Sequence, residues 1–150
     1  MTNVSNILLV DEEELLREAT ALLLANRGAN ITKSATIEDA LRQLERRTYD
    51  VIVVDIPENH PNPARFLELL LAKTSSSARF VVCTEKPLTP EAPTGITQVL
   101  VKPYPFGQLI EAIFPMRGIV RHRPRHASGL VTRRINPPRR TPILLKRGRA

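Results

Sequence analysis

Short apolar runs recur along the first two thirds of the chain, and most of them stop at a side chain that can take part in chemistry. The strongest is Val51-Ile52-Val53-Val54, which ends at Asp55. Short β-branched runs without polar alternation are typical of parallel strands that are covered on both faces. The other runs are Ile7–Val10, Ile31–Lys33 (the weakest), Phe80–Cys83 and Val99–Val101. The pattern predicts five strands, of which 51–54 is central.

Four segments beside these runs have the residue spacing of helices. They are marked by Leu15, Leu16, Ala19, Leu22 and Leu23; by Ile37, Ala40, Leu41 and Leu44; by Phe66, Leu67, Leu70 and Leu71; and by residues 108–114 before Pro115. Arg27-Gly28 provides a basic last turn and a glycine stop for the first helix. Thr36 and Asp39 offer a capping box for the second.

Two segments are too rich in proline for regular structure. Residues 56–63 and residues 85–95 each contain three prolines. Proline interrupts the hydrogen bonding of both helices and strands, so both segments are predicted to be loops. Strands that alternate with helices imply right-handed crossovers, and hence a three-layer α/β fold with a parallel sheet. In such sheets the ligand site lies at the carboxyl ends of the strands.

The residues at those strand ends form a suggestive set. They are Asp11 with Glu12, Asp55, Thr84 and Lys102. Carboxylates brought together repel each other, and a hard divalent cation such as Mg²⁺ relieves that repulsion. One of the carboxylates could act as a nucleophile and become an aspartyl phosphate. Lys102 and the Thr84 hydroxyl would then interact with the phosphoryl oxygens.

At these positions the chain resembles the receiver domains of two-component response regulators. The resemblance covers about residues 5–115 and rests on the segments "ILLVDEEELLRE", "YDVIVVDI", "VVCT" and "GITQVLVKP". It implies a flavodoxin-like, doubly wound sheet with the strand order 2-1-3-4-5. It also implies a phosphoacceptor, Asp55, assisted by Thr84 and Lys102, with the peptide before Pro103 cis as in many members.

The resemblance also implies the metal ligands and the partner. Mg²⁺ would be held by Asp11, Glu12, Asp55 and the backbone carbonyl of Pro57. The phosphoryl donor would be a sensor histidine kinase or a phosphotransfer protein. Such a chain is a phosphoacceptor rather than an enzyme in the usual sense, although it could hydrolyse its own acyl phosphate.

The sequence departs from the family pattern at four places. Glu12 replaces the commoner Asp, and the usual Met-Pro-x-x-Asp-Gly turn after Asp55 is missing. Only 18 positions separate Thr84 from Lys102, with three prolines where the family has its fourth helix, which is therefore predicted to be degenerate. Val99 stands where the family has its switch aromatic. We therefore expect phosphoryl acceptance to be retained, but not the usual mode of output.

Charge divides the chain into two parts. Residues 1–115 hold all 15 acidic residues and 11 basic ones, a net charge of −4, whereas residues 116–150 carry +11 and no acid. The first part is predicted to be the receiver domain. The second is predicted to be a basic Arg/Pro-rich tail that is disordered by composition and able to contact nucleic acid. It has no aromatic side chain for stacking on bases.

Several classes of protein are not expected. No apolar run approaches the roughly 18 residues of a membrane-spanning helix, and the first residues lack the basic region of a signal peptide. Cys83 is the single cysteine, which excludes an internal disulfide and suits the cytoplasm. Two functional hypotheses remain. One is a stand-alone receiver in a phosphorelay, and the alternative is a non-phosphorylated pseudo-receiver that acts as a binding module through its basic tail.

Overall fold

The computed structural model describes residues 4–116, and its centre is a parallel sheet in the order β2-β1-β3-β4-β5. The strands are β1 (Asn6–Val10), β2 (Asn30–Ser34), β3 (Val51–Asp55), β4 (Arg79–Thr84) and β5 (Gln98–Val101). All four neighbouring pairs are parallel. The predicted strand order and the central place of residues 51–54 are confirmed.

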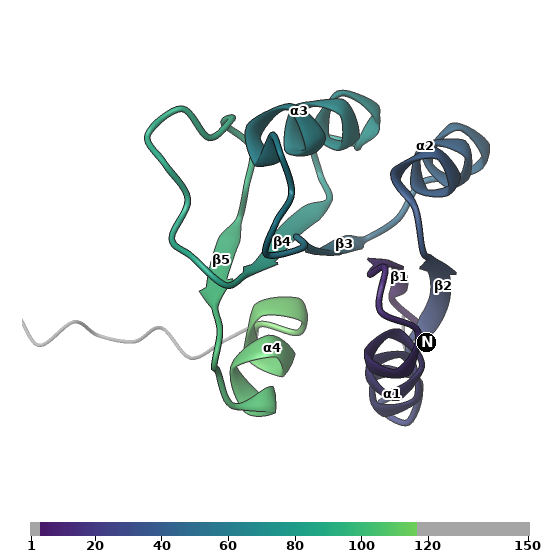
Figure 1. Ribbon diagram of the computed structural model, residues 1–150. Coiled ribbons are helices and arrows are strands. Elements are labelled where there is room, and N and C mark those ends of the chain that lie inside the picture. Colours follow the sequence, from purple (N-terminus) through teal and green to yellow (C-terminus); the bar gives the residue numbers. More distant parts are fainter. Residues whose placement is uncertain (1–3, 117–150) are drawn as a thin grey trace, which may run out of the picture. The chain divides into compact units, whose positions relative to one another are not determined.

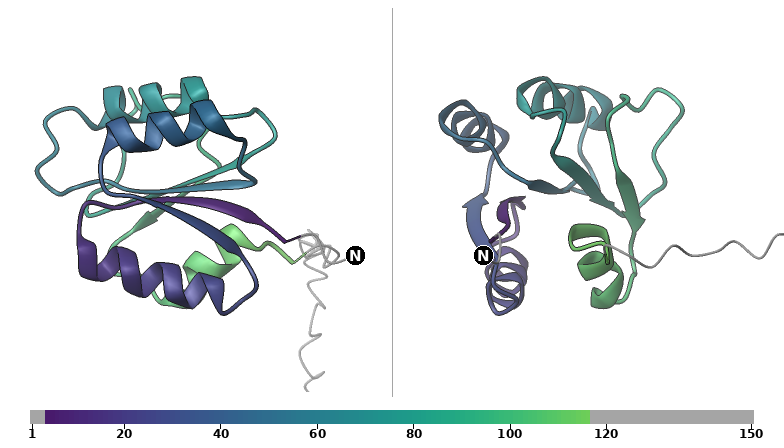
Figure 2. Two further views of the ribbon diagram at one scale, coloured as in Figure 1. Left: turned by 90° about the vertical axis from the view of Figure 1, so that its right-hand side faces the viewer. Right: turned by 180° about the vertical axis from the view of Figure 1, so that it is seen from behind.

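Four helices cover the sheet in two pairs. They are α1 (Glu14–Ala25), α2 (Ile37–Arg46), α3 (Pro63–Lys73) and α4 (Phe106–Ile113). Helices α1 and α4 lie on one face of the sheet, and α2 and α3 lie on the other (Figure 1; Figure 2). The predicted three-layer, doubly wound architecture is confirmed. Within residues 4–116, no helix is long and apolar enough to span a bilayer.

The side chains of the central strands divide between two cores because successive residues of a strand point to opposite faces. On β1, Ile7 and Leu9 join the core under α1 and α4, whereas Leu8 and Val10 join the core under α2 and α3. Residues of β3 and β4 alternate in the same way. This double burial explains why the strands appear in the sequence as continuous apolar runs.

Helix α1 is present as predicted, but the leucines that predicted it do not face the core. Leu15 is 80% exposed and Leu22 is 64% exposed, whereas the buried residues of α1 are Ala21 and Leu24. Gly28 has a φ of +85° and ends the helical segment as expected, because glycine enters the left-handed region without steric cost. The predicted basic last turn is wrong, because α1 ends at Ala25, before Arg27.

Side-chain caps fix the starts of α2 and α3. The Thr36 hydroxyl accepts a hydrogen bond from the backbone N–H of Asp39 (3.2 Å), and the Asn62 side chain accepts one from the N–H of Arg65 (3.0 Å). The carboxylate of Asp39 accepts instead from the Ser34 hydroxyl (2.7 Å), so the capping box is only half formed. The predicted loop 56–63 is one residue too long, because Pro63 is the first residue of α3, where its missing N–H costs nothing.

Between β4 and β5 the chain forms no helix, as the three prolines predicted. The segment is attached to the sheet by two hydrogen bonds, one from the N–H of Thr97 to the carbonyl of Phe80 (2.8 Å) and one from the N–H of Phe80 to the Thr97 hydroxyl (2.9 Å). Gly95 has a φ of +104°, and a Cβ there would lie 3.3 Å from Leu71. The position therefore requires glycine for both backbone conformation and space.

The predicted division at residue 115 stays a prediction. Of residues 116–150 only Met116 is described, so all eleven basic residues of the predicted tail lie outside the described residues.

Candidate functional site

The carboxyl ends of the strands bring together most of the residues that the sequence singled out. Asp55 ends β3 and pairs in register with Cys83, the neighbour of Thr84 on β4. Asp11 follows β1, and its N–H donates to the carbonyl of Ser34 (3.0 Å). Lys102 follows β5, and its N–H donates to the carbonyl of Thr84 (2.8 Å). Parallel pairing therefore places all four residues at one edge of the sheet.

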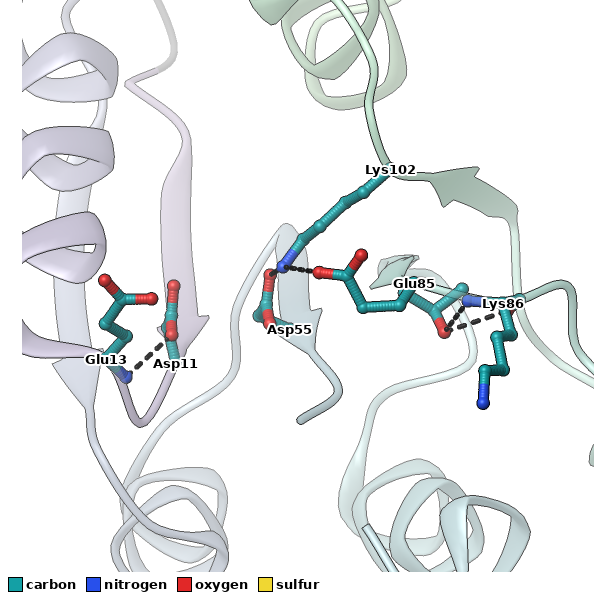
Figure 3. A network of polar contacts seen from close by, with 7 residues as sticks. Asp11, Glu13, Asp55, Glu85, Lys86 and Lys102 are labelled. Carbon is teal, nitrogen blue, oxygen red and sulfur yellow. Dashed lines mark hydrogen bonds and ion pairs between the residues drawn. The ribbon is translucent and has the colours of Figure 1, made fainter. Parts of the chain in front are cut away.

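Asp55 and Lys102 form the closest contact of the site. The ammonium Nζ lies 2.7 Å from Asp55 Oδ2, and both side chains are mostly buried (Figure 3). Burial raises the pKa of Asp55 despite the opposing hydrogen bond from Lys102. Burial lowers the pKa of Lys102, but the hydrogen bond and charge of Asp55 outweigh it, so this pKa is raised. Lys102 is thus held as a cation beside a carboxylate oxygen that a reagent can reach.

Asp11 is the most buried carboxylate of the site, with 6% of its surface exposed. Its Oδ1 accepts a hydrogen bond from the N–H of Glu13 (2.9 Å), which fixes the side chain toward the sheet edge. Burial raises the pKa of Asp11, the Glu13 hydrogen bond opposes the rise, and the charge of Asp55 adds to it. Asp11 and Asp55 are therefore close enough to repel each other.

Thr84 is buried at the end of β4, but its hydroxyl does not contact Asp55. It donates to the backbone carbonyl of Lys86 (2.9 Å) and accepts from the N–H of the same residue (3.3 Å). A hydrogen bond from Thr84 to a group on Asp55 would require this local pair to open. The structure thus places Thr84 at the site's rim, with its hydroxyl committed to its own loop.

Glu12 and Pro57, the other two predicted metal ligands, lie beside Asp55. Glu12 is exposed, and together with Asp55, Pro57 and His60 it lines a small cavity of about 200 Å³. Among residues 4–116, no hydrogen bond or ion pair connects Glu12 with Asp11 or Asp55. The assignment of Glu12 and of the Pro57 carbonyl as metal ligands therefore remains a prediction.

The chemistry of the donor set fits Mg²⁺. Two carboxylates, Asp11 and Asp55, stand at the ends of the neighbouring strands β1 and β3, and Mg²⁺ needs only one or two protein carboxylates besides water and phosphate oxygens. In the described part of the chain, no three His, Cys, Asp or Glu side chains gather as a metal-binding group. The residues thus suit a cation that keeps several waters better than one enclosed by protein ligands.

Three further residues, Glu85, Glu13 and Tyr104, lie near the site, although the sequence pattern did not predict them as part of it. The Glu85 carboxylate lies 3.6 Å from Lys102 Nζ, and the charges of Glu85 and Glu13 both add to the raised pKa of Asp55. Tyr104 packs against the core that contains Cys83, and burial raises the pKa of the Cys83 thiol to about 11. Cys83 is thus the small buried residue that its apolar strand predicted. Glu85 directly follows Thr84, and this adjacency is the signal that could have identified it.

A second and larger cavity, of about 440 Å³, opens between the two proline-rich loops. It is lined by Pro57 and Pro61 of the first loop, by Pro87 and Leu88 of the second, and by Thr84. The cavity lies beside the segment between β4 and β5, which forms no helix. The peptide between Lys102 and Pro103, on the far side of the site, is cis, as the resemblance implied.

Comparison with known proteins identifies the family. A family model described as the response regulator receiver domain matches residues 7–114. The chain belongs to the response regulator receiver family. The receiver match spans every element of the sheet and all four site positions at its edge. No curated protein sequence matches the chain.

Solved structures of receiver domains share this fold. A receiver domain protein from Methanospirillum hungatei has a TM-score of 0.65 at 19% identity, over 74% of this chain and 91% of that one. The protein TrrA from Thermotoga maritima, in complex with Mg²⁺ and BeF, has a TM-score of 0.62 at 23% identity, over 72% and 95%. A response regulator from Burkholderia pseudomallei, with a phosphorylated aspartic acid, a calcium ion and citrate, has a TM-score of 0.61 at 21% identity, over 73% and 66%. The chain therefore spans just under two thirds of the Burkholderia protein.

Proposed function

We propose that this receiver domain accepts a phosphoryl group on Asp55, in a phosphorelay that begins at a sensor histidine kinase or a phosphotransfer protein. The observation that carries the proposal is the 2.7 Å contact between Asp55 and Lys102 at the end of the central strand, with Asp11 directly after the neighbouring strand β1. The solved relatives that hold Mg²⁺ with BeF, or a phosphorylated aspartic acid, support it.

The reaction follows from the groups at the site. An Asp55 oxygen attacks the phosphorus of the donor while the bond from phosphorus to the donor's imidazole nitrogen breaks, and that nitrogen keeps the electron pair. The product is an acyl phosphate, which carries one more negative charge than the carboxylate it replaces. Lys102 is placed to interact with that charge. Mg²⁺ held by Asp11, Asp55, Glu12 and the Pro57 carbonyl would supply electrostatic stabilisation of the phosphoryl oxygens.

The surface of α1 supports a protein as the donor. Leu15, Leu16, Leu22 and Leu23 are all exposed on this helix, which begins three residues after Asp11. An apolar stripe of this kind on a helix next to a reactive group is typical of a protein-binding surface. A helical phosphodonor docked there would bring its reactive side chain to the edge that holds Asp55.

Labelling of Asp55 tests the proposal directly. Incubation of the full chain with acetyl phosphate and Mg²⁺ is expected to add one phosphoryl group to wild type, detected by intact mass, and none to Asp55→Asn. Asp50→Asn is the matched control, because Asp50 immediately precedes the same strand at its opposite end, and it should label like wild type. The proposal is wrong if wild type remains unlabelled, or if Asp55→Asn is labelled as well.

We also propose a second activity, nucleic-acid binding, on the strength of one observation: residues 116–150 hold eleven basic side chains and no acid. If nucleic-acid binding is the only activity, the chain is a pseudo-receiver that is not phosphorylated and serves as a binding module. The labelling experiment separates the two, and the salt dependence of nucleic-acid binding tests the tail.

A further inference from the structure

Glu85 brings a second carboxylate to Lys102. Its Oε1 lies 3.6 Å from the ammonium that also contacts Asp55 at 2.7 Å, so one cation is shared between two carboxylates (Figure 3). The Glu85 side chain is 41% exposed, whereas that of Asp55 is 18% exposed. The more accessible carboxylate therefore stands on the solvent side of the pair.

The position of Glu85 is held by its neighbours in the chain. Thr84 anchors the turn through both of its hydrogen bonds to Lys86, and Glu85 lies between these two residues. Glu85 also lines the cavity between the proline-rich loops. Its carboxylate is thus directed at Lys102 from this loop. A reagent that approaches Asp55 from the cavity would pass the same loop.

We propose that Glu85 is an electrostatic gate of the phosphoryl site, which occupies Lys102 until a phosphoryl group displaces it and thereby slows reaction with small anionic phosphodonors. This inference rests on the proposed function of Asp55. An incoming phosphoryl group needs the charge of Lys102, and Glu85 both withholds that charge and repels the donor. A donor that is bound by a protein surface gains affinity elsewhere and is less affected by the gate.

The rate of phosphorylation by acetyl phosphate tests the gate. In the full chain with saturating Mg²⁺, Glu85→Gln is expected to raise the labelling rate constant about tenfold over wild type, because one like charge is removed a few ångströms from the reacting group. Glu111→Gln is the matched control, since it removes the same charge at an exposed position of α4 that lines neither cavity and forms no ion pair within residues 4–116. It should change the rate less than twofold.

Two further measurements separate a charge effect from a change in shape. The gain from Glu85→Gln should shrink in about 1 M salt, where the screening length falls to roughly 3 Å. It should also be smaller with phosphoramidate, whose ammonium group offsets part of the phosphoryl charge, than with dianionic acetyl phosphate. A purely structural role would alter the rates with both donors equally and would not depend on salt. Glu85→Ala should give the same direction as Glu85→Gln.

The outcomes distinguish this inference from the function on which it rests. If wild type labels at Asp55 and Glu85→Gln labels at the same rate or more slowly, the gate is overturned while phosphoryl acceptance stands. If neither protein labels, both proposals are overturned. A faster rate for Glu85→Gln that persists unchanged in high salt also overturns the gate, because the effect would then not be electrostatic.

Discussion

Asp11 shows at the scale of a single residue what it costs to build the site. It is an ionisable side chain almost without solvent contact, its hydrogen bond comes from one backbone N–H, and the nearest carboxylate repels it. Because its pKa is raised on folding, the folded state binds more protons than the unfolded state between the ordinary value of 3.8 and the raised value. The free energy of unfolding therefore falls as the pH rises through that window.

Removal of this charge should stabilise the metal-free protein. Asp11→Asn keeps the oxygen that accepts from Glu13, so at pH 7 we expect its free energy of unfolding to exceed that of wild type by about 1 kcal/mol, or roughly 4 °C in Tm. The gain should disappear below pH 3.8, where the wild-type carboxyl is protonated in both states. Scanning calorimetry in the presence of a chelator measures the difference in Tm at pH 7 and its loss at low pH.

The same variant reports on the metal. Added Mg²⁺ should raise the Tm of wild type, because a ligand that binds only the folded state stabilises it, and should raise that of Asp11→Asn much less. Glu111→Gln, which alters an exposed carboxylate with no ion pair or side-chain hydrogen bond within residues 4–116, should behave like wild type in both experiments. A lower Tm for Asp11→Asn at pH 7 would contradict the inference that the buried charge of Asp11 destabilises the metal-free protein.

At the scale of elements, α1 separates two roles that apolar residues can have. Leu24 has no exposed surface and packs in the core under α1 and α4, whereas Leu22, two positions earlier, is largely exposed. Both residues are leucines within the same helix, and they differ in whether the side chain points toward the sheet or toward solvent. The sequence pattern shows that α1 is a helix, but the packing shows which leucines hold it to the sheet.

Matched substitutions on α1 should therefore differ in stability. Leu24→Ala is expected to lower the free energy of unfolding by about 2–5 kcal/mol, through lost burial and the cavity that it leaves. Leu22→Ala is expected to change it by less than roughly 0.5 kcal/mol. Urea unfolding of the two variants measures the difference. Similar losses for both would mean that the exposed face of α1 is covered in solution.

The loop between β4 and β5 shows how an element can be lost without loss of the site. Leu88 and Ile96 pack against the core under α2 and α3, in a segment that forms no helix. Lys102 nevertheless reaches Asp55, because β5 is paired with β4 and brings the lysine to the shared edge. Val99, at the place of the family's switch aromatic, is itself half-buried in that core. We therefore expect that any response to phosphorylation of Asp55 does not use an aromatic side chain at this position.

At the scale of the whole molecule, the basic character of the chain belongs to its last 35 residues. The acids cluster at the edge that holds Asp11, Glu13, Asp55 and Glu85, an arrangement that disfavours nucleic acid at that edge. Any binding of nucleic acid is therefore expected to depend on residues 116–150, which lie almost wholly outside the described part of the chain.

Salt titration tests this expectation. If six or more of the tail's basic side chains contact phosphates, the affinity of the full chain for duplex DNA should fall by roughly 10³-fold or more between about 50 and 200 mM salt. A chain cut after Pro115 should not bind. Fluorescence anisotropy with a labelled duplex of mixed sequence measures both. Binding that resists salt, or that survives the cut, would rule out the tail as the contact.

The sequence by itself determined the fold and the residues at the sheet edge. The central strands β1, β3 and β4 are buried on both faces, so their apolar runs are continuous and end at Asp11, Asp55 and Thr84, and the run of the edge strand β5 ends at Lys102. Local signals are enough here, because burial on both faces leaves no other use for such runs. The order of those residues, matched to a known family, then predicted the acceptor and its lysine.

Only the tertiary structure decided how the site residues interact. It showed that the Thr84 hydroxyl is bonded to Lys86, that Glu85 shares Lys102 with Asp55, and that the exposed leucines of α1 face away from the core. These are side-chain directions and distances between residues far apart in the chain. They depend on how loops and helices pack against the sheet, and no spacing along the sequence encodes that packing.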